Sequence, residues 1–156
     1  MHDCTDCSIA GRREFLRDVS ALLAAVFIAP LTLRFGRALA ARDTFHTYAI
    51  PDADGATIDK ENQVILVRAE GKAYAFALSC PHQNTALRWH PEDGQFQCPK
   101  HHSRYRPDGV FISGRATRSM DRFALTKDGA NLVVDLDKLF RQDRDATDWE
   151  AAVVVL

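Results

Sequence analysis

The chain has 156 residues, of which 46% are hydrophobic, and this is enough for one globular domain with a modest additional segment. Its formal net charge of −1 gives no support to nucleic acid as a partner, because proteins that bind nucleic acid usually carry a basic surplus. Only four Cys are present, which excludes the dense disulfide framework of small secreted proteins.

The amino-terminal residues have the pattern of an export signal. Residues 11–17 (GRREFLR) resemble the twin-arginine signal, in which two Arg precede a polar residue, Phe and Leu. An uncharged run of fifteen residues, 19–33, follows. As a helix it would measure about 22 Å against about 30 Å of bilayer core, a length typical of signal peptides and marginal for a membrane span. Residues 38–40 (ALA) then form a small-x-small site suited to signal peptidase.

We therefore expect residues 1–40 to be a twin-arginine signal peptide or an N-terminal membrane anchor, with residues 41–156 as the folded domain. This predicts export by the twin-arginine translocase to the periplasm, or to the outer face of the cytoplasmic membrane, of a bacterium. Membrane association would run through residues 15–33. The length favours cleavage over retention, and the sequence leaves both open. Cys4 and Cys7 form a C-x-x-C pair, but no second pair completes a metal site, so we assign them no function.

Beyond residue 41 the hydrophobic pattern is that of β-strands. Residues 64–68 and 73–78, joined by Glu70-Gly71, predict a hairpin because both arms are rich in β-branched and aromatic residues. The other expected strands are 45–50, 95–97, 110–112, 123–126 and 132–135. Residues 137–141 are expected to start a short helix. The final run, 153–156, is expected to be an edge strand on the same domain, with a partner contact as the alternative. The fold class is therefore all-β.

Two short clusters of metal ligands are the most informative feature of the chain. The first is C-P-H at residues 80–82 and the second is C-P-K-H at residues 98–101, with fifteen residues between His82 and Cys98. Each cluster follows a predicted strand, so a rigid sheet can hold two loops at a fixed separation. Two thiolates and two imidazoles suit a [2Fe–2S] centre, and they equally suit a structural zinc ion.

This double motif, together with Ser103 and Tyr105, resembles the Rieske iron–sulfur domain over roughly residues 45–141. The resemblance implies a small antiparallel β sandwich or barrel, with a two-loop cluster-binding part inserted at about residues 78–112. It implies one [2Fe–2S] cluster per chain, with the two Cys on the buried iron and the two His on the outer iron. The implied ligands are Cys80, His82, Cys98 and His101.

The resemblance also assigns roles to the two residues that follow the second loop. Ser103 would donate its hydroxyl to a bridging sulfide, and Tyr105 would donate its phenol to the Cys80 sulfur. Both bonds favour the reduced state, so we expect a potential in the upper part of the range of about −150 to +300 mV given for Cys/His clusters. A zinc site gives no reason for either residue, which favours iron.

These features predict a one-electron carrier rather than a stand-alone enzyme, with a c-type cytochrome or a larger redox-complex subunit as partner. One alternative is the iron–sulfur subunit of a quinol:cytochrome c oxidoreductase of the bc type. That branch has a disulfide across the cluster, at positions that hold Thr85 and Lys100 here, so this chain cannot form it. Another alternative is the small subunit of an arsenite-oxidase-like molybdenum enzyme. A ring-hydroxylating oxygenase is nearly excluded, because no His follows residue 112 to build a second iron site.

Other residues near the motif have simpler interpretations. His102 is expected on the surface beside the cluster, and His90 in contact with solvent. Trp89, Phe96 and Phe111 are expected to shield the cluster and fill a small core. If the outer nitrogens of the His ligands face solvent, the potential should fall as pH rises above neutrality.

Overall fold

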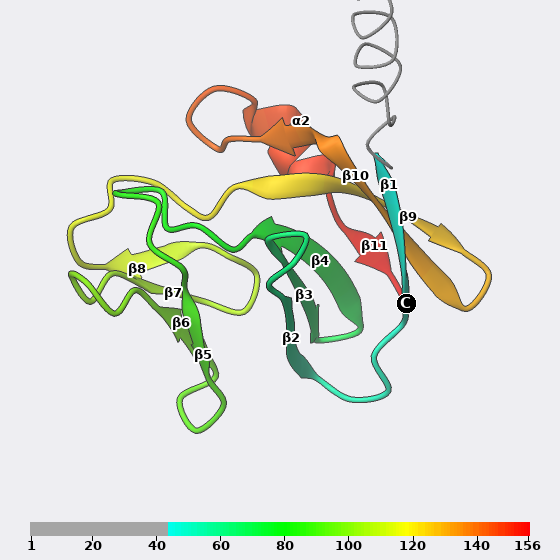
Figure 1. The fold of residues 1–156 in the computed structure, drawn as a ribbon, viewed down its shortest axis with the longest axis horizontal. Coiled ribbons are helices and arrows are strands. Elements are labelled where there is room, and N and C mark those ends of the chain that lie inside the picture. Colours follow the sequence, from blue (N-terminus) through cyan, green and yellow to red (C-terminus); the bar gives the residue numbers. More distant parts are fainter. Residues whose placement is uncertain (1–43) are drawn as a thin grey trace, which may run out of the picture. The chain divides into compact units, whose positions relative to one another are not determined.

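The computed structural model describes residues 44–156, and they form two antiparallel β-sheets (Figure 1). The larger sheet has the order β1-β10-β9-β4-β3-β2, with β11 paired to β4, and the smaller has the order β5-β6-β7-β8. The strands are β1 (Phe45–Ala49), β2 (Gly55–Asp59), β3 (Val64–Ala69), β4 (Lys72–Ala77), β5 (Arg88–His90), β6 (Gln95–Gln97), β7 (Arg104–Tyr105), β8 (Phe111–Ser113), β9 (Arg122–Asp128), β10 (Asn131–Phe140) and β11 (Val154–Val155). One short helix, α2 (Ala146–Ala151), precedes β11. The all-β prediction is confirmed.

The twin-arginine motif, the apolar run at 19–33, the cleavage site and the pair Cys4 and Cys7 lie outside the described residues. Within the described part of the chain, no helix is both long enough and apolar enough to cross a membrane.

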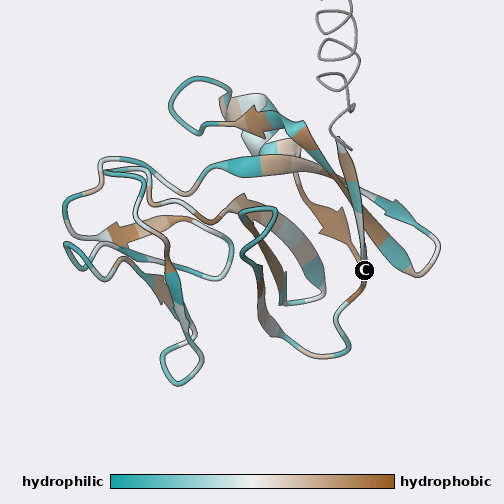
Figure 2. Ribbon diagram, in the orientation of Figure 1, coloured by the Kyte–Doolittle hydropathy of each residue, from teal (hydrophilic) through white to brown (hydrophobic). Residues whose placement is uncertain are grey.

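The β3–β4 hairpin forms the centre of the domain because both of its faces are buried. Side chains alternate across a strand, so Ile65, Val67, Tyr74 and Phe76 enter one core while their neighbours enter another. The first core also contains Cys80 and the buried residues of the small sheet; the second is shared with β9 and β10. Figure 1 shows the hairpin between these two parts, and Figure 2 shows apolar residues along it with polar residues at most turns. Burial on both faces explains the nearly continuous apolar sequence of these strands.

The hairpin turn is tight and uses residues with positive φ. Glu70 has φ of 53° and Gly71 has φ of 72°, the combination that a two-residue hairpin of the primed type requires. The turn predicted at these residues is confirmed.

The small sheet is inserted between β4 and β9. The chain leaves β4 toward Cys80, passes through β5, β6, β7 and β8, and returns to β9, whose Arg122 pairs with Phe76 of β4. Four strands from β5 to β8 are paired in sequence order, so they form a meander. This is the inserted cluster-binding part that the family resemblance implied.

The carboxyl-terminal region differs from the prediction at one place. Residues 137–141 do not start a helix, because β10 continues through a β-bulge and Leu139 and Phe140 pair with Phe123 and Arg122. The helix forms later, at α2, where Trp149 is buried and its indole N–H donates to the Met120 carbonyl at 2.7 Å. The final residues pair with β4 as an edge strand of the same domain, as predicted.

Arg122 connects three parts of the fold from a buried position. Its guanidinium lies 3.5 Å from the centroid of the Trp149 ring in α2 and donates to the Trp149 carbonyl at 2.7 Å. It also donates to the Asp108 carbonyl in the small sheet at 2.7 Å. The hydrogen-bond partners of this buried cation are therefore backbone carbonyls. Its pKa is lowered by burial.

Candidate metal centre

Three loops of the meander meet at one end of the small sheet. They are residues 79–87 before β5, residues 98–103 between β6 and β7, and residues 114–117 after β8. In an antiparallel meander, alternate connections lie at the same end of the sheet, and we call this the ligand end. The turns at residues 91–94 and 106–110 lie at the opposite end.

The two Cys-containing loops have the same backbone geometry. In the first, the Cys80 N–H donates to the Thr85 carbonyl at 2.8 Å, and the Cys80 carbonyl accepts from the Asn84 N–H at 2.9 Å. In the second, the Cys98 N–H donates to the Ser103 carbonyl and its carbonyl accepts from the His102 N–H, both at 2.9 Å. Asn84 and His102 also have similar positive φ angles, 51° and 57°. Backbone hydrogen bonds therefore brace each loop, with no disulfide between Cys80 and Cys98.

The structure brings the four predicted ligands to this end. Cys80 and Cys98 are free thiols with 0% and 1% exposure. The imidazole centroids of His82 and His101 are 4.9 Å apart. Both Nδ1 atoms are buried and have no hydrogen-bond partner among residues 44–156. Buried polar atoms are almost always paired, so two unpaired nitrogens on the same two loops as two buried thiols fit a bound metal cluster with two sulfur and two nitrogen ligands.

Tyr105 is placed to donate a hydrogen bond to one of these thiols. Its hydroxyl lies 3.3 Å from the Cys80 sulfur, and the side chain is fully buried. Burial and the contact with Cys80 raise the pKa of Tyr105 well above its usual value. The phenol therefore keeps its proton at every ordinary pH, and it must be the donor whenever Cys80 is a thiolate.

Ser103 joins the second ligand loop to the loop that follows β8. Its buried hydroxyl oxygen accepts the N–H groups of Arg115 at 3.1 Å and Ala116 at 3.0 Å. These bonds occupy the oxygen as an acceptor and leave its hydrogen available to a group on the ligand side. Gly114 allows this close approach, because a Cβ there would lie 2.4 Å from the Ser103 Cα, and its φ is +112°. Sequence reasoning missed this anchor, although Gly114 beside Arg115 was a usable signal.

Aromatic rings and basic side chains both lie near the candidate ligands. Phe96 is fully buried, Trp89 lies 4.7 Å from it between ring centroids, and Phe111 packs on Tyr105 at 5.9 Å, so these rings help to fill the small core that was predicted. The pKa of the His101 imidazole is lowered, first by burial and then by the charges of Arg115, His82, Lys100 and His102. His102 is exposed beside the site, as expected.

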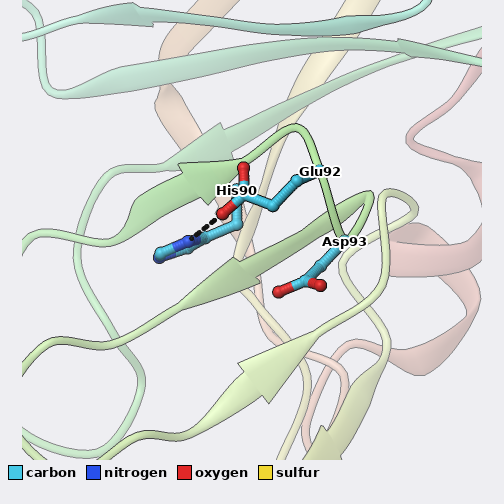
Figure 3. A group of neighbouring side chains, drawn as sticks. All are labelled: His90, Glu92 and Asp93. Carbon is cyan, nitrogen blue, oxygen red and sulfur yellow. Dashed lines mark hydrogen bonds and ion pairs between the residues drawn. The ribbon is translucent and has the colours of Figure 1, made fainter.

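A separate group of polar side chains lies at the opposite end of the meander (Figure 3). His90, Glu92 and Asp93 have potential ligand atoms within 4.8 Å of one another, and both carboxylates are exposed. His90 is the last residue of β5 and its Nδ1 lies 3.0 Å from a carboxylate oxygen of Glu92. Figure 3 shows these two side chains directed toward each other. His90 is half-buried and paired with Glu92 at the end of the small sheet opposite the ligand loops.

Comparison with known proteins agrees with this geometry. Residues 45–124 match the family described as the Rieske [2Fe-2S] domain. A cytochrome b6-f complex iron-sulfur subunit from Synechococcus sp. (strain JA-3-3Ab) is 28% identical over 99 residues, which are 62% of this chain and 58% of that protein. Subunit 3 from Nostoc sp. (strain PCC 7120) is 50% identical over 38 residues, 24% of this chain and 21% of that protein.

Among solved structures, the cyanobacterial plasma membrane Rieske protein PetC3 from Synechocystis PCC 6803 aligns with a TM-score of 0.44 and 25% identity. The alignment covers 51% of this chain and 82% of that protein. The chain spans less than two thirds of the length of the curated relatives that it matches. The match to residues 45–124 covers half of the chain and contains both ligand loops, with their buried thiols and unpaired imidazole nitrogens. The chain therefore belongs to the Rieske [2Fe-2S] domain family, whose cofactor is a [2Fe–2S] cluster.

Proposed function

We propose that this chain is an exported electron-transfer protein whose cluster is held by four side chains, Cys80, His82, Cys98 and His101. The observation that carries the proposal is the pair of buried Nδ1 atoms without hydrogen-bond partners among residues 44–156, on the same two loops as two buried free thiols. When bound, the cluster supplies one-electron redox chemistry. The protein residues hold it, exclude water from its sulfur side with Phe96 and Tyr105, and direct hydrogen bonds toward it.

The charge of the ligand set favours electron uptake. Two thiolates neutralise the two positive charges of the oxidised core, whereas four thiolates would leave it negative. The Tyr105 hydroxyl beside the Cys80 sulfur further stabilises added negative charge. Both effects support a reduction potential above that of clusters with four Cys ligands, whose potentials are about −400 mV.

Electron paramagnetic resonance of the reduced full-length protein, with metal analysis, tests this proposal. We expect a signal that appears only on reduction, together with iron and acid-labile sulfide. His82→Ala and His101→Ala should lose the visible absorption and the signal. His90→Ala and His102→Ala are matched controls, because both residues are His on the same small sheet and neither is a proposed ligand. A colourless, zinc-loaded protein, or full iron content in His82→Ala, would overturn the proposal.

We also propose that residues 1–40 direct export through the twin-arginine translocase, with residues 41–156 as the Rieske domain. The motif at residues 11–17 supports this, and so does the cofactor, because a folded cluster protein requires a route that carries folded proteins. Replacing Arg12 and Arg13 by Lys should keep the protein in the cytoplasmic fraction. The same replacement at Arg34 and Arg37 should leave export unchanged; equal retention of both variants would contradict the proposed signal.

A second function, as a subunit of a bc-type complex, is favoured by the names of the relatives, which are cytochrome b6-f complex iron-sulfur subunits. The absence of Cys at Thr85 and Lys100 argues against it, and a c-type cytochrome remains the proposed acceptor. Copurification of a b-type cytochrome, with quinol-dependent reduction of the cluster, would favour the complex over the free carrier.

A further inference from the structure

Charge is segregated between the two ends of the small sheet. The loops of the ligand end, taken with the strand residues that adjoin them (79–89, 97–104 and 113–117), contain four cationic side chains and no carboxylate. They are Arg88, Lys100, Arg104 and Arg115, all exposed. Within residues 44–156, none of the four forms a salt bridge.

The opposite end has the reverse character. The turn at residues 91–94 carries Glu92 and Asp93, and the turn at 106–110 carries Asp108, which is paired with Arg106. Figure 1 shows the first of these turns projecting from the small sheet beyond the label of β5. The acidic groups of this part of the fold are therefore separated from the ligand end by the length of its strands.

The backbone positions that carry these cations are held by hydrogen bonds and strand pairing. Arg115 is held because its N–H donates to the buried Ser103 hydroxyl, and Lys100 lies inside the braced loop that begins at Cys98. Arg88 and Arg104 flank Gln97 in neighbouring strands, so their Cα atoms form one row across the sheet. The four exposed side chains are therefore tethered to this end of the small sheet, where they add to a local positive field.

We infer that the ligand end is a docking surface for a redox protein whose own cofactor is surrounded by Asp and Glu side chains. This inference rests on the proposed electron-transfer function and adds the chemical character of the partner. His82 and His101 lie at this end, so electron exchange is shortest through it. Four neighbouring exposed cations favour an acidic partner and oppose a basic one.

The net charge of the chain gives a contrasting expectation. With a formal net charge of −1, the whole molecule should show almost no attraction for an anionic reagent. A local basic surface predicts strong attraction at the ligand end. Small charged oxidants distinguish the expectation from net charge from the expectation from local charge, because electron transfer occurs only in encounters near the cluster.

The experiment compares hexacyanoferrate(III), an anion, with tris(phenanthroline)cobalt(III), a cation, as oxidants of the reduced full-length protein in stopped flow. The readout is the ratio of their second-order rate constants, which cancels changes in the potential of the protein. In the wild type we expect this ratio to fall by roughly tenfold or more as ionic strength rises from about 0.01 M to about 0.3 M, because salt screens exposed charges.

Charge reversal at the ligand end tests the assignment. Lys100→Glu combined with Arg115→Glu should lower the ratio at low salt by roughly tenfold or more and remove or invert its salt dependence. Lys100→Gln with Arg115→Gln should give an intermediate ratio, and it tests the inference if the reversed protein fails to fold. The matched control is Lys72→Glu with Lys127→Glu, which makes the same change in net charge at exposed positions away from the ligand loops and should behave as wild type.

The outcomes separate this inference from the proposed function. A variant is compared with the wild type only when its visible absorption shows that the cluster is bound. A wild-type protein without this absorption would contradict the proposed function itself. Intact absorption with equal ratios in the reversed and control variants would overturn the docking surface. Binding of the wild type to phosphatidylglycerol vesicles that is lost only in the ligand-end variant would also overturn it, by showing that the cations contact a membrane.

Discussion

Removing the Tyr105 hydroxyl should lower the reduction potential of the cluster. The hydroxyl lies 3.3 Å from the Cys80 sulfur, and its raised pKa keeps the proton in place. A donor beside a thiolate stabilises the reduced state more than the oxidised state, since the reduced cluster carries one more negative charge. Tyr105→Phe keeps the ring, which packs against Phe111, and removes only this bond.

The size of the shift follows from the strength of one hydrogen bond. A net contribution of about 0.5–1.5 kcal/mol to the difference between the two states is typical. For a one-electron couple, 59 mV corresponds to a tenfold change, or about 1.4 kcal/mol. The potential of Tyr105→Phe should therefore fall by roughly 20–60 mV.

A potentiometric titration followed by visible absorption measures this shift. Tyr74→Phe is the matched control, because Tyr74 belongs to the same core and is buried, but its hydroxyl has no sulfur partner. Its potential should stay close to that of the wild type. An unchanged or raised potential in Tyr105→Phe, with the spectrum intact, would refute the role given to this bond.

Three further predictions concern the scaffold. Gly114→Ala should lower the free energy of unfolding by about 2 kcal/mol or more, because the new Cβ would meet the Ser103 backbone at 2.4 Å. Gly129→Ala, also at positive φ but with open space around it, should cost only the backbone strain of about 1–2 kcal/mol. Equal losses of the two variants in chemical denaturation would contradict this. Arg122→Met should lower the free energy of unfolding by about 2–4 kcal/mol in the same assay, because the carbonyls of Trp149 and Asp108 lose their donors. Removal of the buried charge opposes this loss, so a stabilised variant would show that the desolvation of the cation dominates. Burial and the bond to Asp59 raise the pKa of Tyr48 to about 12. The contribution of Tyr48 to the free energy of unfolding is therefore complete below the ordinary pKa of 10 and is lost as pH rises from 10 to about 12. Tyr48→Phe should flatten the fall of the free energy of unfolding with pH in this range, and an unchanged fall would argue against the assignment.

The strands of the central hairpin and the positions of the ligand loops could be predicted because their signals are local. The apolar runs at residues 64–68 and 73–78, with Glu70-Gly71 between them, specify a hairpin that is buried on both faces. The ligand motifs directly follow β4 and β6. The strands β2, β5 and β7 were not predicted, because each is short and polar and depends on pairing with a neighbour.

The carboxyl-terminal helix was misplaced for a similar reason. Residues 137–141 (DKLFR) place two adjacent apolar residues between charged ones, a pattern that a short helix can accommodate, but pairing of Leu139 with Phe123 extends β10 past its bulge. The packing of Trp149 against Arg122 then fixes the helix several residues later. Tertiary contacts outweighed a weak local preference.

The sequence by itself determined the four candidate ligand side chains, and the family resemblance favoured a [2Fe–2S] cluster over zinc, because two thiols and two imidazoles alone suit both. The tertiary structure alone decided how the surroundings of the site are built. Only folding ties Ser103 to the loop after β8 and collects four distant cations at one end of the small sheet. Folding also gives the contact between Tyr105 and Cys80, which the family resemblance implied, its distance of 3.3 Å. These contacts join residues that are far apart in the chain, and periodicity within a segment carries no information about which segments meet.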